Sequence, residues 1–254
     1  MAPAPRPPGT LAWIDLSTPD LDTATRFYQQ LFSWTLESSP TPMGRYVVGS
    51  VDDGPVGGMM AMPAAPGPPP AWTVFFATDD LDTAYTRAQT AGATGLQPPM
   101  QIPGGDRIAV LTDPAGAVVG LMQSAQPGGL AWGVPGAVAW VETATRDLDT
   151  SRVFYEQIFG WTAVEGANRY WVFEHHGEQV AGMMTMPEQV PGAVPSYWMP
   201  YLAVWDVDHT CVRAVDLGAT VVAAPMSVEA MRFAVLEDPG RAVFGVLQTP
   251  SDAP

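Results

Sequence analysis

The sequence contains no lysine, one cysteine and three histidines in 254 residues. All 11 basic side chains are therefore arginines, and 26 acidic side chains bring the net charge to −15. Without lysine, the chain has no Schiff-base residue and no lysine general base. The single Cys211 excludes an internal disulfide and favours a reducing compartment. An acidic surface without a basic cluster also argues against nucleic acid or an anionic membrane as a partner.

Long apolar runs are missing as well. No run reaches the length of about 18 residues that a transmembrane helix needs. The first residues are rich in proline and lack the apolar segment of a signal peptide, so we interpret 1–10 as a disordered arm. These features predict a soluble cytoplasmic protein.

One stretch of the chain occurs twice. Residues 13–37 and 140–164 align without a gap and are identical at 12 of 25 positions, 127 residues apart. A repeat of this size indicates a duplicated domain. We expect a first domain at 11–126, a linker at 127–135, a second domain at 136–249 and a tail at 250–254.

Each domain contains a further, weaker repeat. Alternating apolar residues at 11–17 predict a strand, and Asp20 is a plausible N-cap for the helix that follows. Three short strands come next, and a related pattern restarts at Trp72, Trp140 and Trp198. The predicted fold is therefore α+β, with four tandem βαβββ units.

The residues that begin and end these units resemble those of a known family. Asp-Leu-Asp-Thr opens a helix with Phe-Tyr, Leu-Phe-Ser-Trp or Ile-Phe-Gly-Trp closes it, and Asp-Pro turns recur at Asp113 and Asp238. This pattern is similar to the vicinal oxygen chelate superfamily, which includes glyoxalase I, bleomycin-resistance proteins and extradiol dioxygenases. Two-domain members of the glyoxalase-like or hydroxylase-labelled subgroup are the most similar. The resemblance implies mixed sheets that curl into open cups and hold a ligand inside.

The resemblance also implies positions for metal ligands, namely a His, Gln or Glu on the first strand of each unit and a Glu on its last strand. Counting back seven residues from the aspartate that starts each helix gives Trp13, Thr73, Trp140 and Met199, and the last-strand positions hold Gly120 and Gly245. His175 and His176 are adjacent, so on a strand they would point to opposite faces. We therefore predict no metal and no cofactor.

A carboxylate follows each of the two first-strand tryptophans. Since alternate residues of a strand share a face, Asp15 should lie beside Trp13 and Glu142 beside Trp140. A buried carboxylate can serve as a general acid or base, so Asp15 and Glu142 are the candidate catalytic residues. Pairing with a repeated arginine would instead make them structural, and both interpretations stay open.

Repeated aromatic, methionine and arginine residues suggest an apolar binding cavity. The candidate ligand-binding residues are Trp13, Tyr46, Met59, Trp72, Arg107, Trp140, Tyr170, Met183, Trp198 and Arg232.

These residues predict a hydrophobic or aromatic small molecule as the partner of a monomer or homodimer. The favoured hypothesis is a metal-independent protein of natural-product metabolism with cyclase, isomerase or hydroxylase-like chemistry. A non-catalytic drug-sequestering protein is the alternative. A pure interaction protein and a metal-dependent lyase or dioxygenase fit less well. The sequence leaves open which of the two cups is used.

Overall fold

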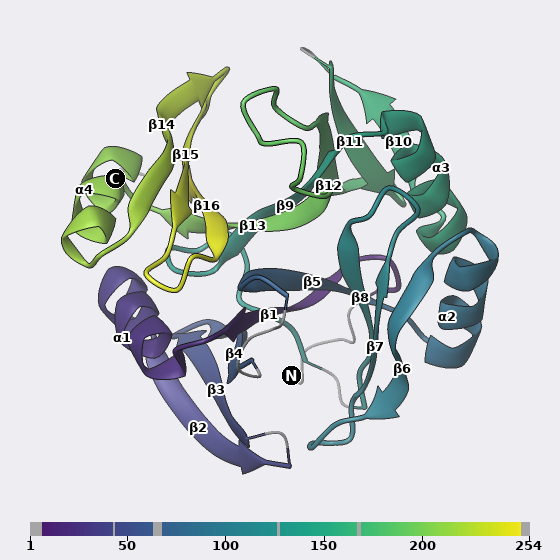
Figure 1. The fold of residues 1–254 in the computed structure, drawn as a ribbon, viewed down its shortest axis with the longest axis horizontal. Helices are drawn as coiled ribbons and strands as arrows, with labels where there is room; N and C mark the ends of the chain where they lie inside the picture. The colour runs from purple at the N-terminus through teal and green to yellow at the C-terminus, as the bar shows by residue number, and fades with distance from the viewer. Residues whose placement is uncertain (1–6, 43, 63–67, 126–127, 167–168, 250–254) are drawn as a thin grey trace. The chain divides into compact units, whose positions relative to one another are not determined.

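The computed structural model describes residues 7–42, 44–62, 68–125, 128–166 and 169–249. Most of the expected N-terminal arm (1–6) and the whole expected tail (250–254) lie outside this range. Within it the chain repeats one strand, one helix and three strands four times (Figure 1).

The first two repeats comprise β1 (Leu11–Thr18), α1 (Leu21–Phe32), β2 (Thr35–Thr41), β3 (Gly44–Val51), β4 (Gly54–Ala61), β5 (Ala71–Ala77), α2 (Leu81–Thr90), β6 (Thr94–Gln101), β7 (Arg107–Thr112) and β8 (Val118–Gln123). The last two comprise β9 (Val138–Thr145), α3 (Leu148–Phe159), β10 (Thr162–Glu165), β11 (Tyr170–His175), β12 (Glu178–Thr185), β13 (Tyr197–Val204), α4 (Val207–Asp216), β14 (Thr220–Val228), β15 (Met231–Glu237) and β16 (Val243–Gln248).

The strands form two eight-stranded mixed sheets. Their orders are β2-β3-β4-β1-β5-β8-β7-β6 and β10-β11-β12-β9-β13-β16-β15-β14, so the two sheets repeat one plan. Within each repeat the first and last strands pair in parallel, as β1 does with β4, and the other neighbours pair antiparallel. The predicted fold class is confirmed, with two domains that each carry one such sheet and its helices.

Aspartates begin all four helices. Asp20, Asp80, Asp147 and Asp206 each accept a hydrogen bond from the backbone N–H three residues later. This N-cap satisfies a donor that the first helical turn leaves free. Hydrogen bonds from Thr23, Thr83 and Thr150 lower the pKa of the first three caps.

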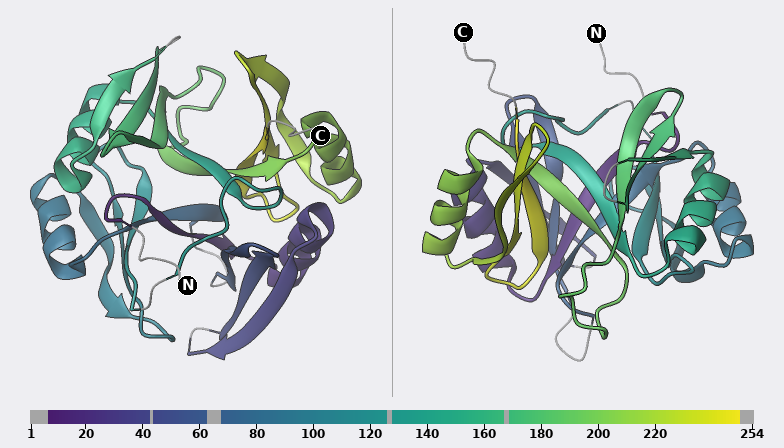
Figure 2. Two further views of the ribbon diagram at one scale, coloured as in Figure 1. Left: turned by 180° about the vertical axis from the view of Figure 1, so that it is seen from behind. Right: turned by 90° about the horizontal axis from the view of Figure 1, so that it is seen from above.

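Packing groups the chain differently from the sequence repeat. One compact unit consists of Met1–Trp13, Thr73–Gly129 and Val141–Met199, and we call it the α2/α3 unit. The other consists of Ile14–Trp72, Leu130–Trp140 and Pro200–Pro254, and we call it the α1/α4 unit. Each is named after two helices that lie side by side in Figures 1 and 2. Each sheet is built from strands of one sequence half, whereas each compact unit combines segments of both halves. The expected domain boundaries therefore stay a prediction.

The core of the α2/α3 unit is built around Tyr155. Its hydroxyl donates to Asp113 (2.8 Å) and accepts from the indole N–H of Trp198 (2.7 Å). The rings of Phe76 and Trp161 pack beside that of Trp198. Burial raises the pKa of Asp113 and raises that of Tyr155 well above its usual value. A phenol and a carboxyl group from different sequence halves are therefore hydrogen-bonded to each other in a buried core, where both hold their protons more tightly than in water.

The α1/α4 unit has the same arrangement. The Tyr28 hydroxyl donates to Asp238 (2.9 Å) and accepts from Trp72 (3.0 Å). The Trp34 indole donates to the carbonyl of Gly136 (2.8 Å), as Trp161 donates to Gly9 (2.9 Å) in the other unit. Trp34 thus binds the segment just before β9, and Trp161 binds the segment just before β1.

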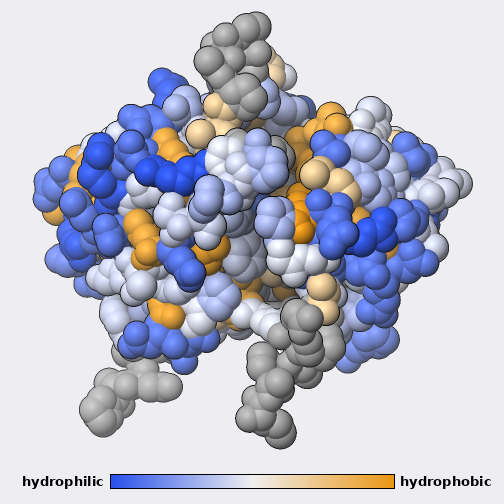
Figure 3. Space-filling view, turned by 90° about the horizontal axis from the view of Figure 1, so that it is seen from below, coloured by the Kyte–Doolittle hydropathy of each residue, from blue (hydrophilic) through white to orange (hydrophobic). Residues whose placement is uncertain are grey.

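In the described ranges no helix is both long and apolar enough to span a bilayer. The face shown in Figure 3 is mostly hydrophilic, and its apolar residues form small separate groups.

Candidate functional site

Strand β1 separates its side chains into two environments. Ile14 and Leu16 are fully buried, whereas Trp13, Asp15 and Ser17 are partly exposed on the opposite face. Asp15 accepts a hydrogen bond of 2.5 Å from the hydroxyl of Tyr46 on β3. The alternation expected from the sequence therefore brings Asp15 onto the face of Trp13, and the carboxylate has a phenol donor there.

Strand β9 carries the corresponding pair. Glu142 is 6% exposed and accepts a hydrogen bond of 3.0 Å from the hydroxyl of Tyr170 on β11. Trp140, two residues earlier, is partly exposed. Burial, and then the charge of the Glu142 carboxylate, raise the pKa of Tyr197. The Glu142 carboxylate therefore has a phenol donor, as the Asp15 carboxylate has.

Glycines allow these contacts between strands. Asp15 faces Gly58 in the β1–β4 register, and Glu142 faces Gly182 in the β9–β12 register. A Cβ added at Gly58 would lie 1.8 Å from the hydroxyl oxygen of Tyr46. The absence of a side chain at Gly58 therefore lets the phenol reach across β4 to the carboxylate.

Apolar side chains gather beside Trp13 in the α2/α3 unit. Ala12, Phe75, Ala77 and Met122 form a buried cluster, and partly buried Trp13, Ile108 and Val110 pack against it. Phe75 pairs with Gly120, and its ring occupies the space next to that glycine, 2.1 Å from a Cβ placed there. Tyr201 and Gly245 repeat this arrangement in the α1/α4 unit.

Four of the predicted ligand-binding residues lie elsewhere. Trp72 and Trp198 are 4% exposed, and their indole N–H groups bind Tyr28 and Tyr155 in the two cores. Met59 and Met183 are fully buried. Met59 pairs with buried Leu16, so it faces away from Asp15, as Met183 faces away from Glu142. Their neighbours Met60 and Met184, partly exposed, lie on the carboxylate faces instead.

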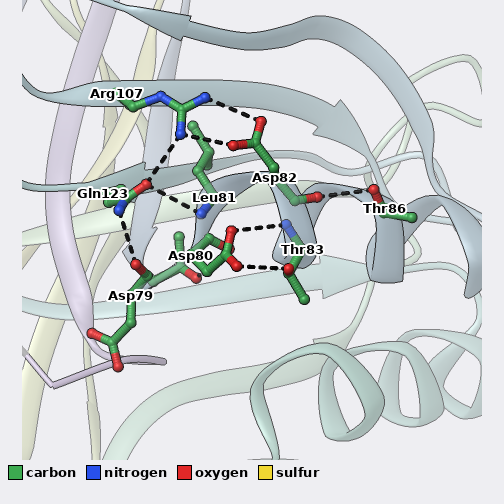
Figure 4. A network of polar contacts seen from close by, with 9 residues as sticks. Asp79, Asp80, Leu81, Asp82, Thr83, Thr86, Arg107 and Gln123 are labelled. Carbon is green, nitrogen blue, oxygen red and sulfur yellow. Dashed lines mark hydrogen bonds and ion pairs between the residues drawn. The ribbon is translucent and has the colours of Figure 1, made fainter.

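The repeated arginines bind helix starts. Arg107 forms hydrogen bonds of 2.8 and 3.0 Å with Asp82 in the first turn of α2 (Figure 4). Arg232 binds Asp208 of α4 in the same manner, and Arg45 binds Asp22 of α1. Asp82 raises the pKa of Arg107, and Arg107 lowers that of Asp82. Arg107 and Arg232 thus pair with exposed aspartates of α2 and α4, and these ion pairs anchor α2 and α4 to β7 and β15.

Sequence reasoning missed Phe75 and Tyr197, and of the repeated methionines it selected Met59 and Met183 for the site rather than Met60 and Met184. Gly58 and Gly182 lie opposite the carboxylates, so strand alternation from these glycines would have placed Met60 and Met184 on the same faces. Phe75 could have been found because its partner is a glycine at an expected ligand position. Tyr197 has no counterpart in the first half, where Ala71 begins the matching strand, so no repeat pointed to it.

The side chains at the expected metal positions do not fit a divalent ion. Indole, threonine hydroxyl, thioether and glycine occupy positions where the resemblance implies imidazole, amide or carboxylate ligands. The rings of Phe75 and Tyr201 fill the space in which side chains from residues 120 and 245 would stand. Across the described ranges, no group of three or more His, Cys, Asp or Glu residues could hold a metal. His176 lies in a turn with φ of 53°, not on a strand as expected.

Comparison with known proteins places the chain among relatives of the same length. Residues 10–121 match the model of the glyoxalase/bleomycin resistance protein/dioxygenase superfamily, and residues 140–247 match a glyoxalase-like domain. The anthracycline biosynthesis protein DnrV of Streptomyces peucetius is 37% identical over 266 residues, covering 95% of this chain and 94% of its own. CFP32 of Mycobacterium tuberculosis (strain CDC 1551 / Oshkosh), provisionally named a glyoxylase, is 34% identical over 250 residues, covering 94% and 95%.

Solved structures share the fold at low identity. The Mn(II)-bound glyoxalase from Novosphingobium aromaticivorans has a TM-score of 0.66 at 16% identity, over 95% of this chain and 82% of that one. A mutant of 4-hydroxymandelate synthase from Streptomyces coelicolor has a TM-score of 0.61 at 16% identity, over 96% and 93%. Together with the full-length relatives, these matches confirm the resemblance seen in the sequence. The chain belongs to the glyoxalase/bleomycin resistance protein/dioxygenase superfamily.

Proposed function

We propose that this protein is a metal-independent enzyme of natural-product metabolism that acts on a flat aromatic or polyketide-like molecule. The observation that carries the proposal is the pair of phenol–carboxylate contacts, Tyr46 to Asp15 and Tyr170 to Glu142. Each lies on a partly exposed face that also carries tryptophan and methionine. The similarity to DnrV, named for anthracycline biosynthesis, supports this class of substrate.

In this proposal the apolar groups bind the rings of the substrate and the polar groups orient it. Trp13, with the partly buried Ile108 and Val110, offers an apolar surface on which fused rings can stack. Phenol hydroxyls and carboxylates bind the oxygens of the substrate and fix its orientation. Trp140, Met60 and Met184 supply similar contacts on their strands.

The proposed chemistry is proton transfer without net oxidation. A carboxylate, Asp15 or Glu142, removes an acidic proton from carbon next to a carbonyl, and the electron pair moves onto the carbonyl oxygen as an enolate. Once the carboxylate is protonated, the tyrosine hydroxyl that donated to it can donate its hydrogen bond to that oxygen instead. The same carboxyl group returns the proton at another carbon, so the substrate is isomerised. Alternatively, the enolate carbon adds to a second carbonyl and closes a ring, and the carboxyl group returns the proton to the alkoxide oxygen that this forms.

Substrate screening tests the proposal. Chelator-treated protein is incubated with polycyclic aromatic polyketides, binding is followed by tryptophan fluorescence, and products are detected by mass spectrometry. We expect turnover in chelator, with kcat lowered about 100-fold by Asp15→Asn or by Glu142→Gln. Trp13→Leu should remove part of the quenching, whereas Trp205→Leu, at a tryptophan that is 67% exposed, should leave ligand affinity unchanged.

Other outcomes assign other functions. Tight binding with no product would instead support a sequestering protein of the bleomycin-resistance type. Turnover that disappears with chelator and returns with added metal would overturn metal independence. Binding of no aromatic compound would refute the proposal as a whole.

A further inference from the structure

An open hollow lies on the α2/α3 unit where helix α2 meets helix α3. Its volume is about 810 Å³. Its polar walls are formed by Asp82, Thr83, Thr86, Arg87, Thr90 and Gln157, all of them exposed. The residues from Thr83 to Thr90 that line the hollow recur every three or four positions, which places them on one face of α2. A polar stripe about 10 Å long therefore runs along this helix beside α3.

The α1/α4 unit shows the same place with the two helices bridged. Arg213 of α4 matches Arg87 in the repeat, and Gln30 of α1 matches Gln157. The Arg213 guanidinium donates to the backbone carbonyl of Gln30 (2.6 Å), so this arginine joins α4 to α1. Arg87 instead lines the hollow, and its guanidinium has no hydrogen-bond or ion-pair partner within the described ranges. Its N–H groups are therefore available to a ligand.

The side chains around the two arginines also differ. His209, Val212 and Asp216 of α4 stand where α2 carries threonines 83, 86 and 90. The threonine at 90 replaces the negative charge that Asp216 places one helical turn from Arg213. Asp82 remains in the hollow, but two hydrogen bonds from Arg107 offset its charge (Figure 4). The hollow on α2 thus favours an anion more than its counterpart on α4 does.

The threonines of the hollow can accept hydrogen bonds from a ligand. The Thr83 hydroxyl donates to the Asp80 carboxylate, and those of Thr86 and Thr90 donate to backbone carbonyls one turn earlier. Their protons are thereby used, but a hydroxyl oxygen that donates still has two lone pairs. The stripe therefore presents acceptors along α2, and they suit ligand groups that donate, such as hydroxyls.

We propose that this hollow is a binding site for a small polyhydroxylated anion, such as a sugar phosphate or a sugar acid. Arg87 binds the phosphate or carboxylate through parallel N–H groups, as its planar guanidinium allows, and the Gln157 amide donates from α3. The hydroxyls of the ligand donate to the threonine oxygens. None of the lining residues that the structure describes belongs to a phenol–carboxylate pair, so the site goes beyond the proposed function and can hold or fail without it.

Isothermal titration calorimetry at low ionic strength tests the proposal with matched compounds. Wild type is titrated with sorbitol phosphate, gluconate, sorbitol and inorganic phosphate. We expect at least one of the two hydroxylated anions to bind, and sorbitol and inorganic phosphate to bind about tenfold more weakly. Binding of sorbitol phosphate alone would identify the anionic group as phosphate, and binding of gluconate alone would identify it as carboxylate.

Variants of matched residues locate the site. Arg87→Gln should weaken binding of the hydroxylated anion about tenfold, because the charged donor is lost. Arg213→Gln is the control and should bind this anion as wild type does, while its urea unfolding midpoint falls because the bond to Gln30 is lost. Thr86→Val keeps the branched shape and should weaken binding about fivefold. Urea midpoints verify that each variant is folded.

Several results would overturn the proposal. Wild type may bind neither hydroxylated anion, or Arg87→Gln may bind it with the affinity of wild type. Equal losses in Arg87→Gln and Arg213→Gln would show that positive charge in general, and not the hollow, attracts the ligand. Equal affinity for sorbitol phosphate and inorganic phosphate would mean an adventitious ion only, and unchanged affinity in Thr86→Val would refute the contacts with ligand hydroxyls.

Discussion

At the scale of single residues, the two halves differ at positions that otherwise match. Thr143 on β9 corresponds to Leu16 on β1, and both side chains are fully buried. The Thr143 hydroxyl has no hydrogen-bond partner among the residues that the structure describes. A buried hydroxyl without a partner reduces stability, because it has lost its hydrogen bonds to water.

Replacing Thr143 by valine should therefore stabilise the protein. The shapes are similar and the unpaired hydroxyl disappears, so we expect the free energy of unfolding to rise by about 1 kcal/mol in urea titrations. Thr145→Val is the matched control and should lower it, because Thr145 bonds Ser151. A loss of stability in Thr143→Val comparable to that of the control would contradict this explanation.

The buried carboxyl group of Asp113 should give a distinct dependence on pH. Burial raises its pKa above the ordinary 3.8, and hydrogen bonds from Ala117 and Tyr155 offset this only in part. Because the folded state holds the proton more tightly, the stability from this group is complete below 3.8 and is lost as pH rises through the folded pKa. Each pKa unit of difference corresponds to about 1.4 kcal/mol.

Asp113→Asn removes this titration. The stability of wild type relative to Asp113→Asn should thus fall as pH rises from below 3.8 through the folded pKa, as measured by urea unfolding at a series of pH values. Asp238→Asn should behave alike, since burial also raises the pKa of Asp238. A relative stability that rises across this window would show that the hydrogen bonds outweigh burial.

At the scale of elements, close approach of strands depends on glycine. The Phe75 ring of β5 lies over Gly120 of β8, and the Tyr201 ring of β13 lies over Gly245 of β16. A side chain at either glycine would push the ring away from the face that carries the predicted ligand contacts. The same two glycines stand where the family resemblance implies a carboxylate.

Gly120→Ala should displace Phe75. The added Cβ would lie 2.1 to 2.5 Å from atoms of the ring, so we expect a loss of about 1–3 kcal/mol in the free energy of unfolding, measured in urea. Gly128→Ala is the control, because no atom lies within 4 Å of its Cβ position. Equal stability of the two variants would mean that the ring has room to move.

At the scale of the molecule, the sequence halves depend on each other. Tyr28 of the first half bonds Asp238 of the second, and Tyr155 of the second bonds Asp113 of the first. Each compact unit therefore combines segments from both halves. We therefore expect the two halves to depend on each other for folding.

Separate expression of 1–126 and 127–254 tests this interdependence. We expect each fragment alone to be unfolded or self-associated, because its phenol or carboxyl partner is missing. Co-expressed fragments should bind each other, and Tyr155→Phe should weaken that binding about tenfold, since it leaves the Trp198 indole N–H without its acceptor and removes the Tyr155 hydrogen bond to Asp113. Cooperative unfolding of either fragment as a monomer, seen by calorimetry and sedimentation, would contradict the interdependence.

Much of the local structure followed from the sequence. The βαβββ order, the Asp20 cap and the shared face of Trp13 and Asp15 depend on strand alternation and helix capping, which act over a few residues. The candidate site was only partly predictable. Trp72 and Trp198 repeat as conspicuously as Trp13 and Trp140, yet their indoles bind tyrosines in the cores.

The sequence by itself determined the duplication, the fold class and the carboxylates that follow Trp13 and Trp140, because repeats and periodicity are written in the order of residues. Only the tertiary structure decided that Tyr46 reaches Asp15, that Tyr170 reaches Glu142, and that Arg107 and Arg232 bind helix starts. These contacts join residues far apart in the chain. Strand register, and the space left by glycines, determine which of several similar side chains come into contact. Neither can be predicted from the local sequence pattern.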